Sequence, residues 1–182
     1  LESRGRRRSR QRRILSKHPW RHRFRRTAAD EQFLSGEALQ SLGACILGRR
    51  TFDIAENAWG DHPPFGVAPV FVLTHRPHPT LVRGATTFTF VTTGIMSALD
   101  QARAAAGHKD VNLMGANVSQ QFLRAGLVDE MEIHVANVLL GAGRSLFVNV
   151  ADHPLKLERI RVIAPPAVTH LRYRVLRQGA SH

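Results

Sequence analysis

Cysteine is nearly absent from this 182-residue chain, because Cys45 is the only one. A single cysteine forms no internal disulfide, which excludes a disulfide-stapled secreted domain and favours a reducing compartment. No apolar run reaches the roughly 18 residues that a membrane span needs. The N-terminus is charged and no apolar stretch follows it, so it lacks the pattern of a secretory signal. We therefore expect a cytoplasmic protein without a membrane partner.

Motifs for metal binding and hydrolysis are also missing. Residues 28–178 contain no C-x-x-C pair and no H-x-x-x-H spacing, so we expect no metal site. Cys45 lies in an apolar run and is expected to be a buried structural thiol rather than a nucleophile. His134 is expected to be a histidine of the core or of a sheet face, and Ser119 lacks the G-x-S-x-G context of a hydrolase.

Acidic residues are almost absent from the first 26 positions, and this gap accounts for the net charge of +12. That segment carries eleven Arg and one Lys against Glu2, a net charge of +11. The remaining 156 residues hold 14 basic and 13 acidic side chains, a net charge of +1. The high pI therefore describes a tail, and it does not make the rest of the chain a nucleic-acid binder.

Residues 1–27 are predicted to be a disordered basic tail, since like charges repel and no apolar periodicity is present. Three interpretations stay open. In the first, the tail is an artefact, such as a misread upstream frame in a chain that begins with Leu1. In the second, it is a solvated extension. In the third, it is an arm that binds nucleic acid or an anionic membrane. Nucleic acid is expected as a partner only through residues 1–26. The composition changes at Ala28, and residues 28–178 are predicted to form one domain.

Within this domain, apolar periodicity predicts alternating helices and buried strands, followed by an antiparallel tail. Short apolar runs that end in glycine or polar residues predict the buried strands, and Pro165-Pro166 predicts a hairpin. The fold class is therefore α/β, with a mostly parallel sheet, helices on its faces and an antiparallel edge. The predicted helices cover 28–42, 50–57, 94–106 and 118–125, and the predicted strands cover 44–47, 69–74, 86–92, 111–114, 129–140, 155–164 and 168–176.

Three predicted strands lead directly into glycine or polar residues and then into a helix or loop. Ligands of open α/β sheets bind beyond the carboxyl ends of strands, where helix N-termini offer free N–H groups to phosphate. Arginine grips phosphate through two N–H groups, threonine can cap a helix, and glycine lets a ligand approach the backbone. Ordinary turns with solvated side chains remain the alternative at each position. The candidate phosphate-binding residues are Gly48, Arg49, Arg50 and Thr51, then Thr74, His75 and Arg76, then Gly115, Ala116, Asn117 and Val118.

These segments resemble the dihydrofolate-reductase-like family related to the reductase domain of the bacterial riboflavin-biosynthesis deaminase–reductase. The resemblance covers roughly residues 28–177. The segments that carry it are Gly43-Ala44-Cys45-Ile46-Leu47-Gly48-Arg49-Arg50-Thr51-Phe52-Asp53, 64–77 with Val70-Phe71-Val72-Leu73-Thr74-His75-Arg76-Pro77, Val111-Asn112-Leu113-Met114-Gly115, 125–130 and Leu139-Leu140-Gly141-Ala142-Gly143-Arg144-Ser145-Leu146-Phe147.

The resemblance implies a dihydrofolate-reductase-like fold with a C-terminal antiparallel hairpin, NADPH as cofactor, and hydride transfer to a pterin-like or pyrimidine-like small molecule. A 5-amino-6-(5-phosphoribosylamino)uracil reductase is the type it implies. It places the first and third strand-end motifs at the cofactor phosphates and Thr74, His75 and Arg76 at the adenosine end. It places Gly141, Gly143 and Arg144 near the substrate cleft, and it implies a homodimer. No side chain is assigned as a catalytic acid, since water can supply the proton.

The chain departs from the family pattern at three places. The family opens with an apolar strand and a Ser-Leu-Asp-Gly-like segment, and the arginine-rich tail stands there instead. Ala116 replaces the second of two glycines, and Asn137 stands where the family tends to have proline. Loss of a central strand leaves backbone groups without sheet partners at about 1–3 kcal/mol each when buried, which predicts reduced stability. A degenerate, non-catalytic relative is therefore the alternative to a reductase.

Overall fold

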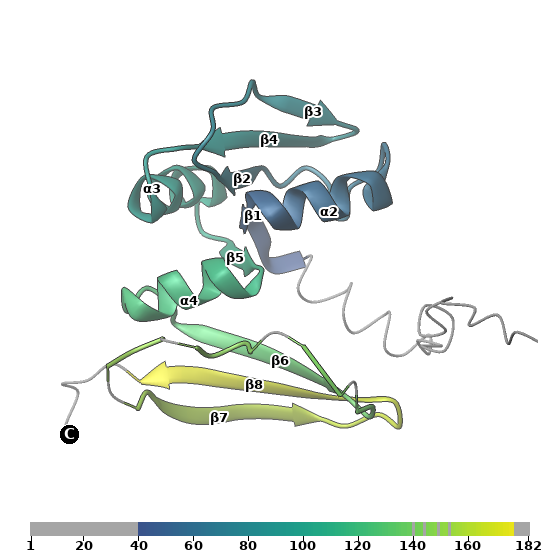
Figure 1. Ribbon diagram of the computed structural model, residues 1–182, viewed down its shortest axis with the longest axis vertical. Helices are drawn as coiled ribbons and strands as arrows, with labels where there is room; N and C mark the ends of the chain where they lie inside the picture. The colour runs from purple at the N-terminus through teal and green to yellow at the C-terminus, as the bar shows by residue number, and fades with distance from the viewer. Residues whose placement is uncertain (1–39, 140, 144, 149, 153, 177–182) are drawn as a thin grey trace, which may run out of the picture.

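The computed structural model describes residues 40–139, 141–143, 145–148, 150–152 and 154–176 (Figure 1). Strands and helices alternate through the first two thirds of this part, and strands alone follow, as the sequence predicts. The elements are β1 (Leu42–Gly48), α2 (Arg49–Trp59), β2 (Val70–Leu73), β3 (Leu81–Arg83), β4 (Thr86–Val91), α3 (Ile95–Ala106), β5 (Asp110–Met114), α4 (Ala116–Arg124), β6 (Glu130–Ala136), β7 (Lys156–Ile163) and β8 (Val168–Leu176).

Five strands form the first sheet, in the order β3-β4-β2-β1-β5. β1 pairs in parallel with β2 and with β5, and β2 pairs in parallel with β4. The short strand β3 pairs antiparallel with β4 and closes one edge. The central place of β1 explains its composition, because a strand covered on both faces is apolar at consecutive positions. Ala44, Cys45, Ile46 and Leu47 are all buried.

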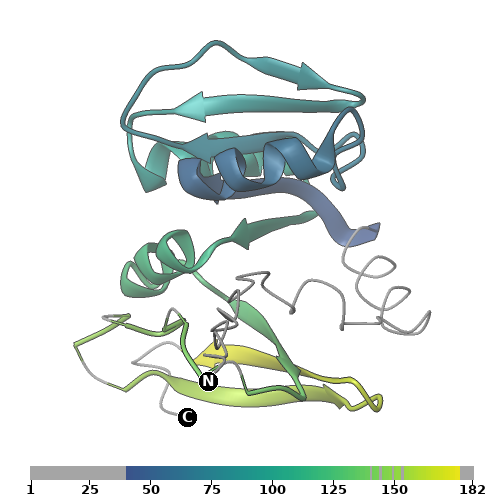
Figure 2. The same cartoon turned by 45° about the vertical axis from the view of Figure 1, so that its right-hand side comes forward.

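Helices cover both faces of the five-stranded sheet, which gives three layers (Figure 2). Alternate residues of β1 point to opposite faces. Ala44 and Ile46 join a core with residues of α3 and α4, including Leu99 and Phe122. Cys45 and Leu47 join the other core, in which Phe52 of α2 meets the strands. A hydrophobic core on each face thus fixes the sheet between its helices, and the loops that follow the strands extend from this packed sheet.

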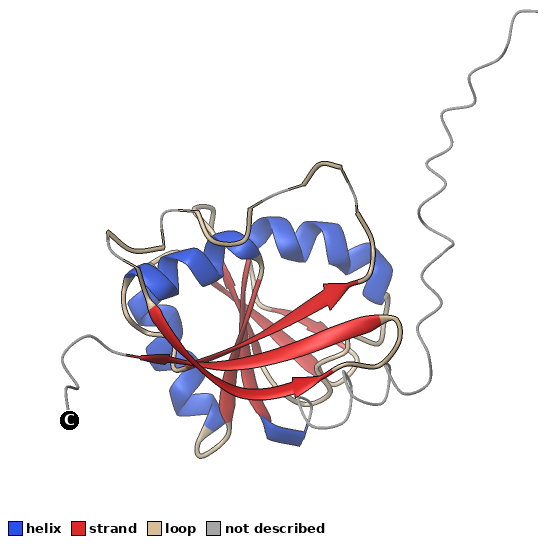
Figure 3. Ribbon diagram, turned by 90° about the horizontal axis from the view of Figure 1, so that it is seen from below, coloured by secondary structure: helices blue, strands red, loops and turns tan. Residues whose placement is uncertain are grey.

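The last three strands form a separate antiparallel sheet, in the order β6-β8-β7. β7 and β8 make the predicted C-terminal hairpin, and β6 pairs with the other side of β8. Figure 3 shows these strands crossing the near side of the molecule without a helix in front of them. The predicted α/β class, with a mostly parallel sheet and helices on its faces, is confirmed. The antiparallel tail, however, makes its own sheet instead of adding an edge to the parallel one.

Strand β5 is an edge of the five-stranded sheet, and strand β6 is an edge of the three-stranded sheet. Within the described residues, β5 pairs only with β1, and β6 pairs only with β8. Helix α4 is the connection between these two edge strands (Figure 1). The break in pairing separates the tail strands from the parallel sheet.

Several predicted boundaries need correction. The predicted helix 28–42 falls mostly outside the described residues, and Leu42 belongs to β1, where it pairs with Asp110. β6 ends at Ala136 rather than at residue 140, because the chain turns there and the Val138 N–H donates to the Ala136 carbonyl oxygen. The three-residue strand β3 was not predicted, since it is too short to show alternation. No helix of the described residues is long and apolar enough to cross a membrane.

Candidate functional site

The three predicted phosphate motifs meet at one edge of the five-stranded sheet. Gly48 is in register with Leu73 of β2, and Leu47 is in register with Met114 of β5. Because β1, β2 and β5 are parallel, the residues that follow them emerge at the same edge. Three adjacent strand ends are therefore followed by Arg49 at the start of α2, by Thr74 in the loop after β2, and by Gly115 before α4. We call this arrangement the strand-end edge.

Arg49 is the most firmly held cation of the strand-end edge. Its Nε donates to Asp53 Oδ1 at 2.7 Å, one helical turn further along α2. Its guanidinium carbon lies 5.4 Å from the ring centre of Phe90 and 5.7 Å from that of Phe52, within cation–π range. The side chain is thus oriented by a carboxylate and two rings. Arg50, the next residue, is exposed.

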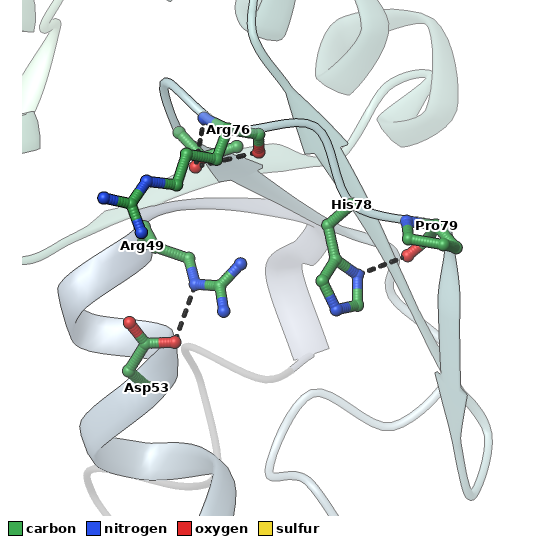
Figure 4. A network of polar contacts seen from close by, with 6 residues as sticks. Arg49, Asp53, Arg76, His78 and Pro79 are labelled. Carbon is green, nitrogen blue, oxygen red and sulfur yellow. Dashed lines mark hydrogen bonds and ion pairs between the residues drawn. The ribbon is translucent and has the colours of Figure 1, made fainter.

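Thr74, His75 and Arg76 form a tight turn after β2. The Arg76 N–H donates to Thr74 Oγ1 at 3.1 Å, and the Thr74 hydroxyl lies 3.2 Å from the Arg76 carbonyl oxygen. The Thr74 N–H donates to the Val91 carbonyl oxygen, which ties the turn to β4. Figure 4 shows the Arg76 side chain above Arg49 on the same side of the strands. The turn thus adds a second guanidinium to this edge, while His75 is exposed.

Gly115, the residue between β5 and α4, lies against the first turn of α2. Its φ is 96°, a conformation that strains residues with a side chain. A Cβ at this position would lie 2.6 Å from Thr51 Oγ1, so the backbone and the hydroxyl are in direct contact. The sequence motif needs a glycine here for two reasons, since both the backbone angle and the available space exclude a larger residue.

Three helices begin at this edge without help from side chains. Helices α2, α3 and α4 follow Gly48, Gly94 and Gly115, and none of these N-termini has a side-chain capping hydrogen bond. None has an acidic residue in its first turn. The prediction that Thr51 caps α2 is therefore wrong, because a glycine occupies the cap position and Thr51 lies in the first turn. Free N–H groups and the helix dipole make each start a favourable place for an anion.

The remaining predicted site residues differ in how they contribute. Ala116, Asn117 and Val118 form the first turn of α4, where Val118 is buried in the core and can offer only its backbone. The Asn117 side chain accepts a hydrogen bond from Gln121 at 2.7 Å. Gly141 and Gly143 are exposed and lie in the segment after β6, and Arg144 lies outside the described residues. Within the part of the chain that the structure describes, no backbone hydrogen bond joins these glycines to the strand-end edge.

Sequence reasoning missed Asp53, His78 and Phe90 as neighbours of this edge. The His78 and Phe90 ring centres are 4.2 Å apart, and His78 Nδ1 lies 2.7 Å from the Pro79 carbonyl oxygen (Figure 4). Arg49 and Asp53 are four residues apart, a spacing at which opposite charges pair on a helix, but the predicted helix began only at Arg50. No sequence signal placed His78 on Phe90, because this contact depends on how the loop after β2 folds back over β4.

Comparisons with solved structures support the fold. A protein from Shewanella sp. PV-4 assigned to riboflavin biosynthesis is 24% identical, with a TM-score of 0.64, and the match covers 81% of each chain. RibD from Acinetobacter baumannii is 22% identical, with a TM-score of 0.61 over 83% of this chain and 51% of that one. This chain thus spans about half of that protein. The riboflavin biosynthesis reductase Rib7 of Saccharomyces cerevisiae is 11% identical, with a TM-score of 0.52 over 81% and 80% of the two chains.

Sequence comparison gives the family. Among curated protein sequences, none matches the chain as a relative. The model of the RibD C-terminal domain matches residues 11–169, which is most of the chain. The matched range includes all three strand-end motifs. The chain belongs to the RibD C-terminal domain family.

Proposed function

We propose that this protein is an NADPH-dependent reductase of a pyrimidine-like small molecule, of the 5-amino-6-(5-phosphoribosylamino)uracil reductase type. One observation carries the proposal: three uncapped helix N-termini and two arginines converge on the strand-end edge of a RibD C-terminal domain. The described residues fit a dinucleotide with several phosphates, because no carboxylate occupies the first turn of any of the three helices.

The two ends of the cofactor are assigned by charge and space. The pyrophosphate is assigned to the N-termini of α2 and α4, where Gly115 leaves the backbone N–H groups open. The 2′-phosphate is assigned to Arg76, with Arg49 beside it, because guanidinium groups bind phosphate through paired N–H donors. His78 and Phe90 offer flat faces next to these cations for the adenine ring. Together these groups bind and orient the cofactor.

The chemistry of the reaction comes from the cofactor. Bound NADPH supplies a hydride, and the protein contributes its position and its electrostatic surroundings. Asp53 and Phe90 hold Arg49, so this cation is in place before any ligand arrives. Such preorganisation spares the binding step the cost of fixing a flexible side chain. Gly141, Gly143 and Arg144 are proposed for the substrate side, as the family resemblance implies.

A homodimer in the cytoplasm is the proposed state of the protein. The support is an apolar face of the three-stranded sheet. By their register, Val135 of β6 and Leu157 and Val162 of β7 project from the same face, and they are 43–47% exposed. Clustered exposed apolar side chains mark interaction surfaces. A second copy of the chain would cover them.

Cofactor binding tests the proposal directly. The purified full chain is titrated with NADPH and, separately, with NADH, and nicotinamide fluorescence is followed. Arg76→Ala is expected to weaken NADPH binding by about 10–100-fold, since a hydrogen-bonded charge contributes about 1.5–3 kcal/mol, and to leave NADH binding nearly unchanged. Arg103→Ala, on the last turn of α3, is the matched control and should change neither. Wild-type protein that binds no NADPH near neutral pH would remove the basis of the proposal.

A non-catalytic relative is the second candidate, because the described residues place no strand between β5 and β6. In the family pattern, the missing opening segment lines the substrate and nicotinamide pocket. This candidate predicts NADPH binding without oxidation when a pyrimidine substrate is added. The reductase predicts that the absorbance of NADPH falls with substrate. The alternative of a nucleic-acid arm rests on residues 1–26, which lie outside the described residues.

A further inference from the structure

Three side chains of metal-binding type lie together on the three-stranded sheet, away from the strand-end edge. Glu132 and His134 are on β6, separated by one residue, and His170 on β8 is in direct register with His134. Residues i and i+2 of a strand share a face, and residues in register on an antiparallel pair share it too. All three side chains therefore project from the same face of the β6–β8 ladder.

The ligand atoms of this trio are close enough for one ion. One donor atom from each residue lies within 4.8 Å of the others, and the two Nδ1 atoms of His134 and His170 are 2.7 Å apart. The ligand atoms of a tetrahedral zinc site are about 3.3 Å apart, given bonds of about 2.0–2.2 Å. Binding an ion thus requires the two rings to separate slightly and Glu132 to approach.

The burial of the three residues permits such an adjustment. His170 is 2% exposed and is fixed in the sheet, whereas Glu132 and His134 are accessible at its surface. One ligand is thus rigid and the other two can rotate around it. The ring-to-ring contact of the histidines, with centres 4.9 Å apart, already holds both imidazoles on the same side of the ladder.

Neighbouring cations compete with a metal ion for Glu132. Arg161 Nη2 lies 4.0 Å from Glu132 Oε1, at the outer limit of an ion pair. Arg172 is paired with Glu130 instead, because its Nη2 lies 2.7 Å from Glu130 Oε2. Exposed ion pairs contribute about 0–1 kcal/mol, which is small beside the free energy of a structural zinc site. The carboxylate of Glu132 is therefore available to an ion at little cost.

We propose that Glu132, His134 and His170 bind one Zn²⁺ ion, with water as the fourth ligand, and that the ion fastens β6 to β8. Two imidazoles and a carboxylate suit zinc better than calcium or magnesium, which prefer oxygen ligands alone. The assignment goes beyond the reductase function and is independent of it. The ion would stabilise this sheet in addition to its ladder hydrogen bonds and ion pairs.

Cobalt is the spectroscopic probe for this site, since Co²⁺ takes zinc sites and its visible absorption reports tetrahedral coordination. The full chain, freed of metal with a chelator, is titrated with CoCl₂ and then with ZnCl₂. We expect a visible band that saturates at one equivalent and disappears when Zn²⁺ is added. His134→Gln should weaken binding by more than about 100-fold, because even loss of a group that orients a ligand costs about 10–100-fold. His108→Gln, an exposed histidine outside the trio, should bind like wild type.

Thermal melting gives a second, independent measurement. Zn²⁺ should raise the melting temperature of wild type and His108→Gln, because a ligand that binds only the folded state stabilises it. It should not raise that of His134→Gln above the melting temperature of the metal-free form of the same variant. Absence of a tetrahedral cobalt band, or a band that persists in His134→Gln, would overturn the assignment. NADPH titration of the same samples reports separately on the reductase proposal.

Discussion

The two sheets of this protein contrast in how they are stabilised. Every buried apolar side chain among the described residues lies between Leu42 and Leu123, in or around the five-stranded sheet. The three-stranded sheet contributes one buried residue, His170, and that residue is polar. Its own contacts are ladder hydrogen bonds and ion pairs. The first sheet carries its own core, whereas the second has no buried apolar side chain among the described residues.

The largest expected difference is between isoleucines of the two sheets. Ile46, fully buried in β1, and Ile160, 42% exposed in β7, offer a matched pair. Ile46→Ala should cost about 2–5 kcal/mol in the free energy of unfolding, since it leaves a cavity in the core. Ile160→Ala should change it by about 0.5 kcal/mol or less, as most surface substitutions do. Urea denaturation measures both. Equal losses would mean that the second sheet is covered in solution, as in the proposed homodimer.

Two glycines with positive φ give the next contrast. Gly115→Ala should cost about 1–3 kcal/mol through backbone strain, with a further loss from the contact with Thr51. It should also weaken NADPH binding, because the strand-end edge must shift. Gly141→Ala meets no atom within 4 Å and should cost about 1 kcal/mol from its backbone angle alone. If Gly115→Ala and Gly141→Ala changed stability equally and also changed NADPH binding equally, this would argue against a cofactor site at Gly115.

The buried thiol of the first sheet predicts a dependence on pH. Burial raises the pKa of Cys45 from 9.0 to about 12, so the folded protein keeps its proton where the unfolded chain loses it. This contribution to stability is present below pH 9 and is lost as the pH rises from about 9 to about 12. Between pH 8 and 10 the loss should be about 1 kcal/mol.

A variant in each sheet isolates this effect. Cys45→Ala should remove that part of the pH dependence when denaturation curves at pH 8 and 10 are compared with those of wild type. Val135→Cys, at a position of β6 that is 47% exposed, should add no pH dependence of its own. It should also react readily with a thiol reagent under native conditions, where Cys45 stays unreactive. Rapid labelling of Cys45 in the folded wild type would contradict its burial.

The smallest effect is expected from the ion pairs of the second sheet. Arg174 Nη1 lies 2.8 Å from Glu158, and Arg174 Nη2 lies 3.9 Å from Glu130. Because Arg174 is about half exposed, Arg174→Ala should cost at most about 0.5–1 kcal/mol and less at high salt. Melting curves at low and high ionic strength measure this change. A large loss that salt does not reduce would show that the ladder is stabilised by more than exposed charges.

The sequence predicted the first sheet better than the second for a physical reason. Continuous apolar runs such as 44–47 reflect burial on both faces, and that constraint leaves an unmistakable pattern. The glycine after β5 stands out in the sequence because glycine is required where φ is positive and space is short, as at Gly115. Register across β6 and β8 is not written in any local pattern. The trio formed by Glu132, His134 and His170 is therefore recognised only in the fold, where β6 and β8 bring it together. Along the chain, the spacing of these residues matches no metal-binding motif and argued against a metal site.

The three uncapped helix N-termini have a practical consequence for work with this protein. Each helix start carries the equivalent of about half a positive charge, which belongs to the backbone and survives any side-chain substitution. Removing both Arg49 and Arg76 would therefore leave a residual attraction for anions at the strand-end edge. Sulfate and phosphate buffers would occupy the same N–H groups and compete with the proposed dinucleotide. Affinities should accordingly be compared in a buffer whose anions are large and weakly hydrogen-bonding.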